Sequence, residues 1–401
     1  MELKYQMMTS KALHHAFEIA RVAGIKIILG VFVALAVIYS VATPAFETPD
    51  EMAHFAYIRG LVDGRGFPTA PIVVADDQPA QESSQPPLYY VSAALAVRLI
   101  APDTGDLAEW SVRNPAFPYI FGSTYNDNKN IVLHSLPEVF PYSGAARALH
   151  VARLVTVLFG ALAVWATYRM GCEAFPRNLA VGLMAAAVVA FTPQFVFISG
   201  AASNDPAAVA MCALSLWAVV RVMHHGFTWR RAVALGIGLS LAALSKASAV
   251  ALAPLAIVAL IAVSADRQSA IKRRIRWALL VLAIVFLLAG VWYLRTWIMF
   301  GDPLGTSPHM AMPWARPEPL SIGQAVSLLP GTLTSFWLAF GWGNIVAPDW
   351  AYSILNLLAA IGLAGALLWF LKPGQDEVAA DQVSTIKIDR AIVLLFFAYG
   401  A

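Results

Sequence analysis

Four residues between positions 50 and 57 carry side chains that can move protons or hold a polar ligand. Asp50 and Glu51 are adjacent carboxylates, and His54 and Tyr57 follow at helical spacing. In a helix, Asp50, His54 and Tyr57 share one face. A carboxylate in such a group acts as a general base when an acceptor hydroxyl comes within hydrogen-bond reach. The candidate catalytic residues are Asp50 and Glu51, and the candidate substrate-binding residues are His54 and Tyr57.

The same stretch also fits an ordinary helix start. Thr48 is a favourable N-cap residue, Pro49 suits the first helical position, and Glu51 stands three residues after the cap, which is a capping box. Asp50 would also be stabilised at the positive end of the helix dipole. Because the capping box gives Glu51 a structural partner, the catalytic hypothesis rests on Asp50.

Three further candidates for substrate binding lie near prolines that begin helices. Gln85 and Tyr89 belong to Gln85-Pro86-Pro87-Leu88-Tyr89-Tyr90, where two prolines precede a short aromatic segment. Tyrosine pairs also anchor proteins at membrane interfaces, which is the structural alternative. Asp205 stands between Asn204 and Pro206, so it fits a helix N-cap as well as a binding site.

Four cations lie near the ends of apolar segments. Lys246 stands between two such segments without a topological reason for its charge, and Arg295 lies near the end of another. Lys and Arg are the residues that bind phosphate, so both are candidate binding residues. Arg147 and Arg153 begin a further segment. For all four, the alternative is that the side chain snorkels to lipid headgroups.

The sequence predicts no metal ion, nucleotide or nucleic acid. The pairs His14-His15 and His224-His225 are adjacent rather than at metal-ligand spacing. A divalent metal held by Asp50, Glu51 and His54 is left open as an alternative, and no cofactor is predicted. The chain has no P-loop and no glycine fingerprint after a strand, and no basic stripe that would bind nucleic acid.

Composition places these residues in a membrane protein. Of the 401 residues, 59% are hydrophobic and only 13% are charged, against about 25% charged residues in soluble domains. The predicted fold class is therefore an all-α polytopic membrane protein. Its two cysteines, Cys172 and Cys212, offer no disulfide framework.

The apolar segments divide the chain into spans and two polar stretches within a single transmembrane domain, 1–401. A ninth apolar segment begins near Ala391 and runs only to Ala401, short of the roughly 20 residues of a full span, so we expect a truncated ninth span. The polar stretches are 44–146 and 300–348, and in the first, residues 49–62 and 86–101 predict helices at the membrane surface. Neither an internal repeat nor a broken helix is evident. The eight predicted full spans are 25–43, 147–170, 178–198, 206–223, 232–245, 247–264, 277–299 and 350–371.

The distribution of Lys and Arg predicts the orientation. With the N-terminus in the cytoplasm, most of these residues in short loops fall on the cytoplasmic side, as the positive-inside rule requires. Both polar stretches, and with them Asp50, are then extracytoplasmic. The first apolar segment exceeds the roughly 7–15 residues of a signal-peptide core, so we expect an uncleaved first span. The predicted location is the plasma (inner) membrane, with multiple passes.

Outward-facing acids and cations without a nucleotide motif favour group transfer from a lipid phosphate. Asp50 would take a proton from an acceptor hydroxyl, and Lys246 or Arg295 would stabilise the departing phosphate. Direct displacement would invert the anomeric carbon of a transferred sugar. A transporter or lipid flippase for an envelope precursor is the alternative, and a non-catalytic scaffold in cell-envelope assembly is a third reading.

The order of these motifs resembles the GT-C membrane glycosyltransferases of the protein O-mannosyltransferase and aminoarabinose transferase type, and among them a bacterial branch of predicted membrane proteins. The resemblance implies a GT-C-like bundle whose long first extracytoplasmic loop carries surface helices. It also implies a polyprenyl-phosphate-linked sugar donor in the membrane and Asp50 as the base, with an acceptor that the sequence does not name. Gln85 stands where the related element commonly has His. The resemblance rests on Pro49-Asp50-Glu51-x-x-His54-x-x-Tyr57, Gln85-Pro86-Pro87-Leu88-Tyr89-Tyr90, Asn204-Asp205, Leu244-Ser245-Lys246, Arg295, Gly301-Asp302-Pro303-Leu304-Gly305, and Ser335-Phe336-Trp337 with Phe340-Gly341-Trp342.

Overall fold

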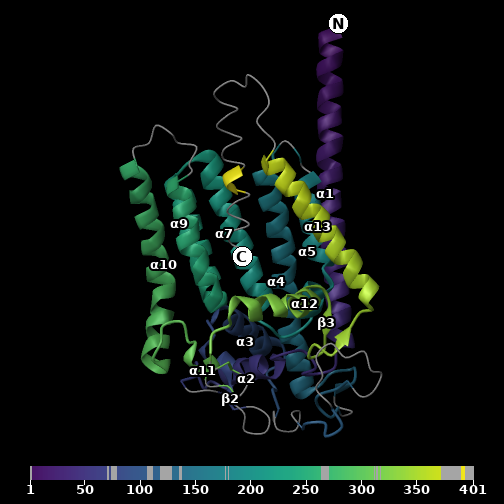
Figure 1. Ribbon diagram of the computed structural model, residues 1–401, viewed down its shortest axis with the longest axis vertical. Coiled ribbons are helices and arrows are strands. Elements are labelled where there is room, and N and C mark those ends of the chain that lie inside the picture. The colour runs from purple at the N-terminus through teal and green to yellow at the C-terminus, as the bar shows by residue number, and fades with distance from the viewer. Residues whose placement is uncertain are drawn as a thin grey trace.

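The protein is a bundle of long apolar helices with a layer of short elements at one end (Figure 1). The computed structural model describes residues 2–69, 72–73, 79–105, 112–117, 129–134, 138–176, 178, 180–262, 271–310, 312, 315–316, 318–371 and 390–392. The predicted truncated ninth span lies almost wholly outside these residues. The bundle helices are α1 (Glu2–Ala42), α4 (Gly144–Ala174), α5 (Ala180–Phe191), α6 (Pro193–Ser199), α7 (Asp205–His225), α8 (Trp229–Ser245), α9 (Leu252–Ala262), α10 (Ile271–Phe300) and α13 (Asp349–Leu371).

Five of these helices are long and apolar enough to cross a membrane, and the bent pair α5–α6 makes a sixth. The five are the Val22–Ala42 part of α1, together with α4, α7, α10 and α13. The prediction of an all-α polytopic membrane protein is confirmed. The predicted span 232–245 lies within α8, which has 17 residues. The predicted span 247–264 contains the 3₁₀ helix Ala247–Ala251 and then α9, which has 11 residues, so neither α8 nor α9 is among the five. At 1.5 Å per residue, α8 extends about 25 Å, somewhat less than a hydrocarbon core of about 30 Å.

The expectation that no helix is broken is wrong. The predicted span 178–198 bends by 65° between α5 and α6. The bend lies at Thr192-Pro193, where proline lacks an N–H group and its ring disfavours helical backbone at the preceding residue. Thr192 is extended instead, with ψ at 114°, and forms the N-cap of α6. The bend directs the end of α6 toward the turn that precedes Asp205.

The long helices pack through small residues. Helix α4 packs on α7, α7 on α8, and α8 on α10. Ala163 of α4 and Ala210 of α7 are fully buried in the largest core cluster. Small side chains let membrane helices approach closely, because van der Waals packing rather than the hydrophobic effect drives their association. The α6–α1 crossing is closer still, since a Cβ on Gly200 would lie 2.8 Å from the Ala36 carbonyl oxygen.

Helices are present at the predicted positions 49–62 and 86–101. Helix α2 spans Glu51–Val62 and α3 spans Leu88–Ile100, and both lie across the lower end of the bundle in Figure 1. Phe55 and Ile58 of α2 are fully buried with Leu149 of α4 in a second core cluster. Their spacing of three residues places them on one helix face. The chain between α2 and α3 contains the 3₁₀ helix η2 (Gln81–Ser84) and the antiparallel strands β1 (Ile72–Val73) and β2 (Pro79–Ala80).

The second polar stretch lies at the same end of the bundle as the first. Its elements are α11 (Ser307–Met310), α12 (Ile322–Trp337), and the antiparallel strands β3 (Ala339–Phe340) and β4 (Ile345–Val346). Helix α12 runs crosswise to the long helices in Figure 1. Ser84 Oγ donates to the Gly305 carbonyl at 2.8 Å, and Trp342 Nε1 donates to the Phe46 carbonyl at 3.2 Å. The aromatic segment near Trp342 therefore ties the second stretch to the chain just before Asp50.

Candidate active site

Asp50 has a strained backbone and a side chain that does not cap the helix it precedes. Its φ is +61°, in the left-handed region that residues other than glycine, asparagine and aspartate rarely enter. The predicted capping box is wrong: Asp50, not Thr48, is the N-cap residue, and it makes no side-chain cap hydrogen bond. Thr48 Oγ1 is buried and has no hydrogen-bond partner among the described residues. The half-buried Asp50 carboxylate is consequently not needed to hold α2.

Glu51 is held by a buried ion pair instead of a capping box. Its Oε2 lies 2.6 Å from Arg153 Nη2, and its Oε1 lies 2.8 Å from Arg153 Nε. The backbone N–H groups of Phe46 and Ala202 donate to the same carboxylate at 3.0 and 2.8 Å. Snorkelling is excluded for Arg153, whose side chain is fully buried. The Arg153 guanidinium also donates to the backbone carbonyls of Ser40, Thr43 and Pro44.

The structure brings Asp50, Asp205 and Lys246 together. Lys246, the C-cap residue of α8, forms an ion pair with Asp205, the first residue of α7. The N-cap of α7 is Asn204, so the expectation that Asp205 itself is the cap is wrong. Burial raises the pKa of Asp50, the negative charge of Asp205 raises it further, and the Lys246 ammonium lowers it. A carboxylate with a raised pKa beside a charge pair has the character of a proton acceptor.

Buried aromatic side chains lie behind these charges. His54 Nδ1 and the Tyr90 hydroxyl are 2.8 Å apart, and the rings of Tyr57 and Tyr90 stack at 3.9 Å. Burial lowers the pKa of His54 to about 4, so its imidazole is neutral at pH 7. The Tyr89 hydroxyl lies 2.9 Å from Thr156 Oγ1, whereas the buried Tyr57 hydroxyl has no partner among the described residues. His54 lies near Asp205 and Lys246, because the negative charge of Asp205 raises its pKa and the positive charge of Lys246 lowers it, both by less than burial does.

Gln85 links the first polar loop to the helices that carry the charge pair. Asn204 Nδ2 donates to Gln85 Oε1 and to the Ser245 carbonyl, each at 3.3 Å. Asn204 and Ser245 are the sequence neighbours of Asp205 and Lys246. Gln85, a candidate substrate-binding residue, thus contacts the sequence neighbour of Asp205.

Arg295 is anchored apart from the charge pair. Its Nη2 donates to the carbonyls of Pro68 and Phe67 at 2.7 and 3.2 Å. The guanidinium stands over the ring of Trp292 at 4.9 Å. Nη1 is buried and has no partner within the described part of the chain. Burial raises the pKa of Tyr57, and the nearby charge of Arg295 opposes that rise, so Arg295 lies next to the aromatic group. No contact joins Arg295 to Asp205 or Lys246 among the described residues.

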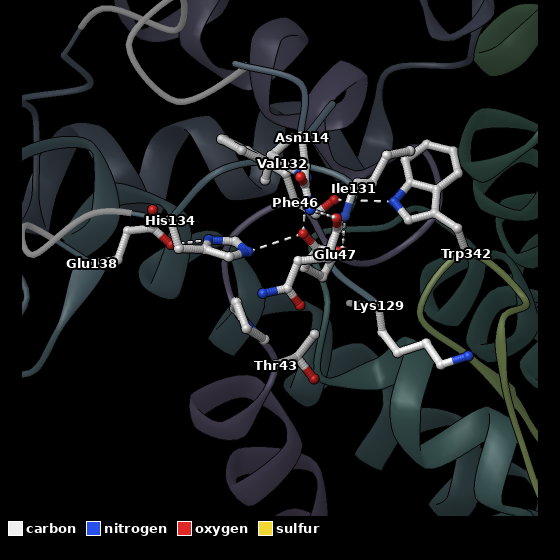
Figure 2. Close-up of polar contacts among 12 residues, drawn as sticks. Thr43, Phe46, Glu47, Asn114, Lys129, Ile131, Val132, His134, Glu138 and Trp342 are labelled. Carbon is white, nitrogen blue, oxygen red and sulfur yellow. Dashed lines mark hydrogen bonds and ion pairs between the residues drawn. The ribbon is translucent and has the colours of Figure 1, made fainter. Parts of the chain in front are cut away.

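Sequence analysis missed an ion cluster centred on Glu47 (Figure 2). Glu47 Oε1 lies 2.9 Å from His134 Nε2, and His134 Nδ1 lies 2.7 Å from Glu138 Oε2. The N–H groups of Ile131 and Val132 also donate to Glu47. Burial lowers the pKa of His134, but hydrogen bonds to Glu138 and Glu47 outweigh burial and raise it to about 9. The protonated His134 therefore fastens the distal loop to a residue three positions before Asp50.

The cluster has only a partial signal in the sequence. His134 and Glu138 are four residues apart, a spacing that commonly pairs an acid with a base. The partner Glu47 is 87 residues away, and no local pattern indicates that contact. Across the described residues, no group of three or more His, Cys, Asp and Glu side chains is arranged to hold a metal ion. The groups suited to an anionic ligand at this end are Lys246 and Arg295.

A family comparison covers the middle of the chain. Residues 146–293 match the family model described as dolichyl-phosphate-mannose-protein mannosyltransferase. The matched region contains Arg153, Asp205 and Lys246, and it excludes Asp50 and Arg295. No curated protein sequence matches the chain.

Three solved structures have a similar fold at low identity. ArnT from Cupriavidus metallidurans bound to undecaprenyl phosphate is 14% identical, with a TM-score of 0.48, over 93% of this chain and 59% of that one. The protein O-mannosyltransferase Pmt1-Pmt2 complex of S. cerevisiae bound to the sugar donor is 16% identical, with a TM-score of 0.44, over 70% of this chain and 35% of that one. The oligosaccharyltransferase AglB from Archaeoglobus fulgidus in complex with an inhibitory peptide and a dolichol-phosphate is 16% identical, with a TM-score of 0.45. The match covers 93% of this chain and 38% of that one.

This chain spans between 35% and 59% of the length of those three proteins. All three TM-scores lie below 0.5, so the assignment rests on the family model and on the motifs. The family match over residues 146–293 confirms what the motifs predict, namely the resemblance of this chain to the membrane glycosyltransferases of the GT-C superfamily.

Proposed function

We propose that this chain is the catalytic part of an inverting glycosyltransferase, which moves a sugar from a polyprenyl-phosphate donor to an extracytoplasmic acceptor. The observation that carries the proposal is the position of Asp50. Its half-buried carboxylate does not cap α2, and it lies close enough to the ion pair of Asp205 and Lys246 for both charges to act on its pKa, which burial raises. The family match supports sugar transfer as the reaction class. The description of that family names a dolichyl-phosphate-linked sugar, which supports a lipid-linked donor here.

The proposed reaction is a single displacement. The Asp50 carboxylate accepts the proton of the acceptor hydroxyl, and the hydroxyl oxygen attacks the anomeric carbon of the sugar. The bond from that carbon to the phosphate oxygen breaks, and its electron pair leaves with the polyprenyl phosphate. Attack opposite the leaving group inverts the anomeric carbon. A raised pKa suits Asp50 to this role, because a stronger base transfers the proton with more driving force.

Lys246 and Arg295 are the proposed phosphate-binding residues. Negative charge grows on the departing phosphate, and a fixed cation near that oxygen lowers the energy of the transition state. Asp205 orients the Lys246 ammonium through their ion pair. The carbonyls of residues 67 and 68 orient Arg295, while its Nη1 keeps a donor without a partner in the described part of the chain. Both cations belong to the end of the bundle that carries Asp50.

His54, Tyr57, Gln85 and Tyr89 are the proposed sugar-side residues. The neutral His54 offers a donor and an acceptor without adding charge, and the Tyr57 hydroxyl is a buried polar group that awaits a partner among the described residues. Glu51 was predicted with Asp50 as catalytic. Since Arg153 and two backbone N–H groups occupy its carboxylate, we propose that Glu51 positions Asp50 rather than receiving a proton itself.

A transporter or lipid flippase is the second candidate function. The bend of 65° between α5 and α6 favours it, because discontinuous helices commonly form substrate sites in transporters. The two functions differ in their dependence on Asp50. A transporter releases its lipid substrate intact, whereas the transferase converts the lipid-linked sugar to free polyprenyl phosphate.

The test is turnover by the full-length protein reconstituted in lipid vesicles. Polyprenyl-phosphate sugars labelled in the phosphate are supplied together with a cell-envelope extract as the source of acceptor hydroxyls, and released polyprenyl phosphate is quantified. We expect Asp50→Asn to reduce turnover by about 10²-fold or more, the usual contribution of a general base. Asp103→Asn is the matched control, because Asp103 is an exposed acid in the same polar stretch. Wild-type turnover by Asp50→Asn would overturn the assignment of the base, and flux of intact lipid without turnover would favour the transporter.

A further inference from the structure

A second polar site lies at the end of the bundle opposite Asp50. A cavity of about 400 Å³ is bordered by α1, α4 and the end of α7. Helix α7 runs 21 residues from Asp205 to His225, so its two ends are about 30 Å apart. This distance separates the cavity from the candidate active site. Its lining includes Val22, Ile25, Trp165, Arg169, Glu173 and His225.

Two tryptophans hold Arg169 at this cavity. The guanidinium carbon of Arg169 lies 4.7 Å from the ring centre of Trp217 and 5.6 Å from that of Trp165. Such cation–π contacts engage the faces of the guanidinium and the ring, and do not consume N–H donors. No carboxylate pairs with Arg169 among the described residues. The side chain is exposed, so its fixed donors face the cavity or solvent.

The acid at the cavity is already shared by other groups. Glu173 lies 2.6 Å from His225 Nε2 and 3.6 Å from Arg221 Nε, and it accepts a hydrogen bond from Trp217 Nε1 at 3.3 Å. Arg221 also stands over the Trp217 ring at 5.5 Å. The positive charge of Arg169 is therefore not neutralised by Glu173, and the cluster as a whole attracts an anion.

We propose that this cavity binds the phosphate group of an anionic phospholipid headgroup, with Arg169 as its main contact. The lining combines polar side chains with Val22 and Ile25 of the membrane span in α1. A lipid presents this combination, a phosphate ester next to apolar carbon. Tryptophans favour the membrane–water interface, and basic pockets between membrane helices bind lipid phosphates. Free inorganic phosphate carries the same kind of charge but has no apolar carbon to contact Val22 and Ile25.

The proposal is tested by lipid binding to the purified full-length protein in detergent. Native mass spectrometry measures the dissociation constants of phosphatidylglycerol and phosphatidylcholine. We expect the wild type to prefer phosphatidylglycerol, and Arg169→Gln to weaken its binding roughly tenfold, as expected when one charge-assisted contact is lost. Arg276→Gln is the control: this exposed arginine begins α10 at the same end of the bundle, outside the cavity lining. Arg169→Lys should recover only part of the affinity, because ammonium lacks the planar stacking of guanidinium.

Other outcomes decide against the proposal. Equal binding of the two lipids by the wild type, or an equal loss in Arg169→Gln and Arg276→Gln, would mean that no Arg169 site exists. Inorganic phosphate at millimolar concentration is the competing ligand. If inorganic phosphate completely displaces phosphatidylglycerol when both are present at the same millimolar concentration, the site binds free phosphate and the lipid assignment fails. Thermal unfolding of each variant confirms that the compared proteins are folded.

Discussion

Glu51 and Arg153 form an ion pair that is closed to solvent on both sides. Both side chains are fully buried, and two contacts of 2.6 and 2.8 Å join the guanidinium to the carboxylate. The pair connects α2 to α4, and Arg153 extends the connection to three carbonyls at the end of α1. Asp50, with its left-handed backbone, lies directly beside this junction.

We expect Glu51→Gln to destabilise the protein substantially. The substitution leaves the Arg153 charge buried without its counter-ion, and breaking a buried pair in this way costs about 3–5 kcal/mol. Denaturant unfolding in mild detergent gives the free-energy difference. Arg147→Gln is a matched control, because Arg147 is exposed in the first turn of the same helix, α4. If Glu51→Gln unfolds like the wild type and yet transfers no sugar, Glu51 takes part in the chemistry directly.

The acid limb of the pH–rate profile should report the charges around Asp50. Transfer requires the deprotonated carboxylate, so activity falls as pH drops through the pKa of Asp50, which burial raises above its ordinary value. Asp205→Asn removes a negative charge that raises this pKa, so the limb moves to lower pH. Lys246→Gln removes a cation that lowers the same pKa, so the limb moves to higher pH. The measurement is kcat/KM against pH for both variants and for the wild type.

The opposite directions of the two shifts make this experiment specific. A general loss of folding or donor binding lowers activity at every pH and leaves the midpoint of the limb in place. Shifts of both variants in the same direction would show that Asp50 is not the titrating base. Asp63→Asn provides a control acid in α2's C-cap, away from the charge pair.

Two replacements of Asp50 should separate the effect of its left-handed backbone on stability from the effect of its carboxylate on catalysis. The folded state raises the pKa of Asp50, so its ionised form is disfavoured and stability contributed by this residue falls as pH rises through that pKa. Asp50→Asn removes the charge and still tolerates a φ of +61°, so we expect stability at pH 7 equal to or above the wild type. Asp50→Ala retains the left-handed backbone without that tolerance, which costs about 1 kcal/mol. Unfolding at pH 7 compares the two variants, and a large loss of stability in Asp50→Asn would contradict a purely functional role.

Much of this fold is predictable because membranes impose long apolar runs. The sequence analysis located every bundle helix and both surface helices, since hydrophobic length and proline positions are local properties. The bend at Thr192-Pro193 also has a local signal, because proline disfavours helical backbone at the residue before it. Span number is harder to predict, because α8 and α9 are apolar like their neighbours but, with 17 and 11 residues, are shorter than a full span of about 20 residues.

The residues proposed for the site were chosen from the sequence, but their contacts could not be predicted from it. Asp205 and Lys246 are 41 residues apart, and Glu51 and Arg153 are 102 residues apart. Only packing of the helices determines such pairs. Thr48 and Glu51 fit a capping box locally, yet the buried Arg153 offers Glu51 a stronger partner, so tertiary structure overrides the local pattern. Arg295 shows the same limit, because its residue type predicts a phosphate-binding residue, whereas its hydrogen bonds to the carbonyls of Phe67 and Pro68 have no local signal in the sequence.

His134 should make stability depend on pH in the alkaline range. Its pKa rises from 6.5 to about 9 in the folded protein, so its two carboxylate contacts stabilise the fold fully below pH 6.5 and are lost as pH rises through 9. In His134→Gln that dependence should disappear. We therefore expect the difference in Tm between wild type and His134→Gln to be largest near pH 6 and to shrink toward zero near pH 10. Groups that titrate in both proteins cancel in the difference, and a difference that stays constant with pH would show that His134 is not protonated between Glu47 and Glu138.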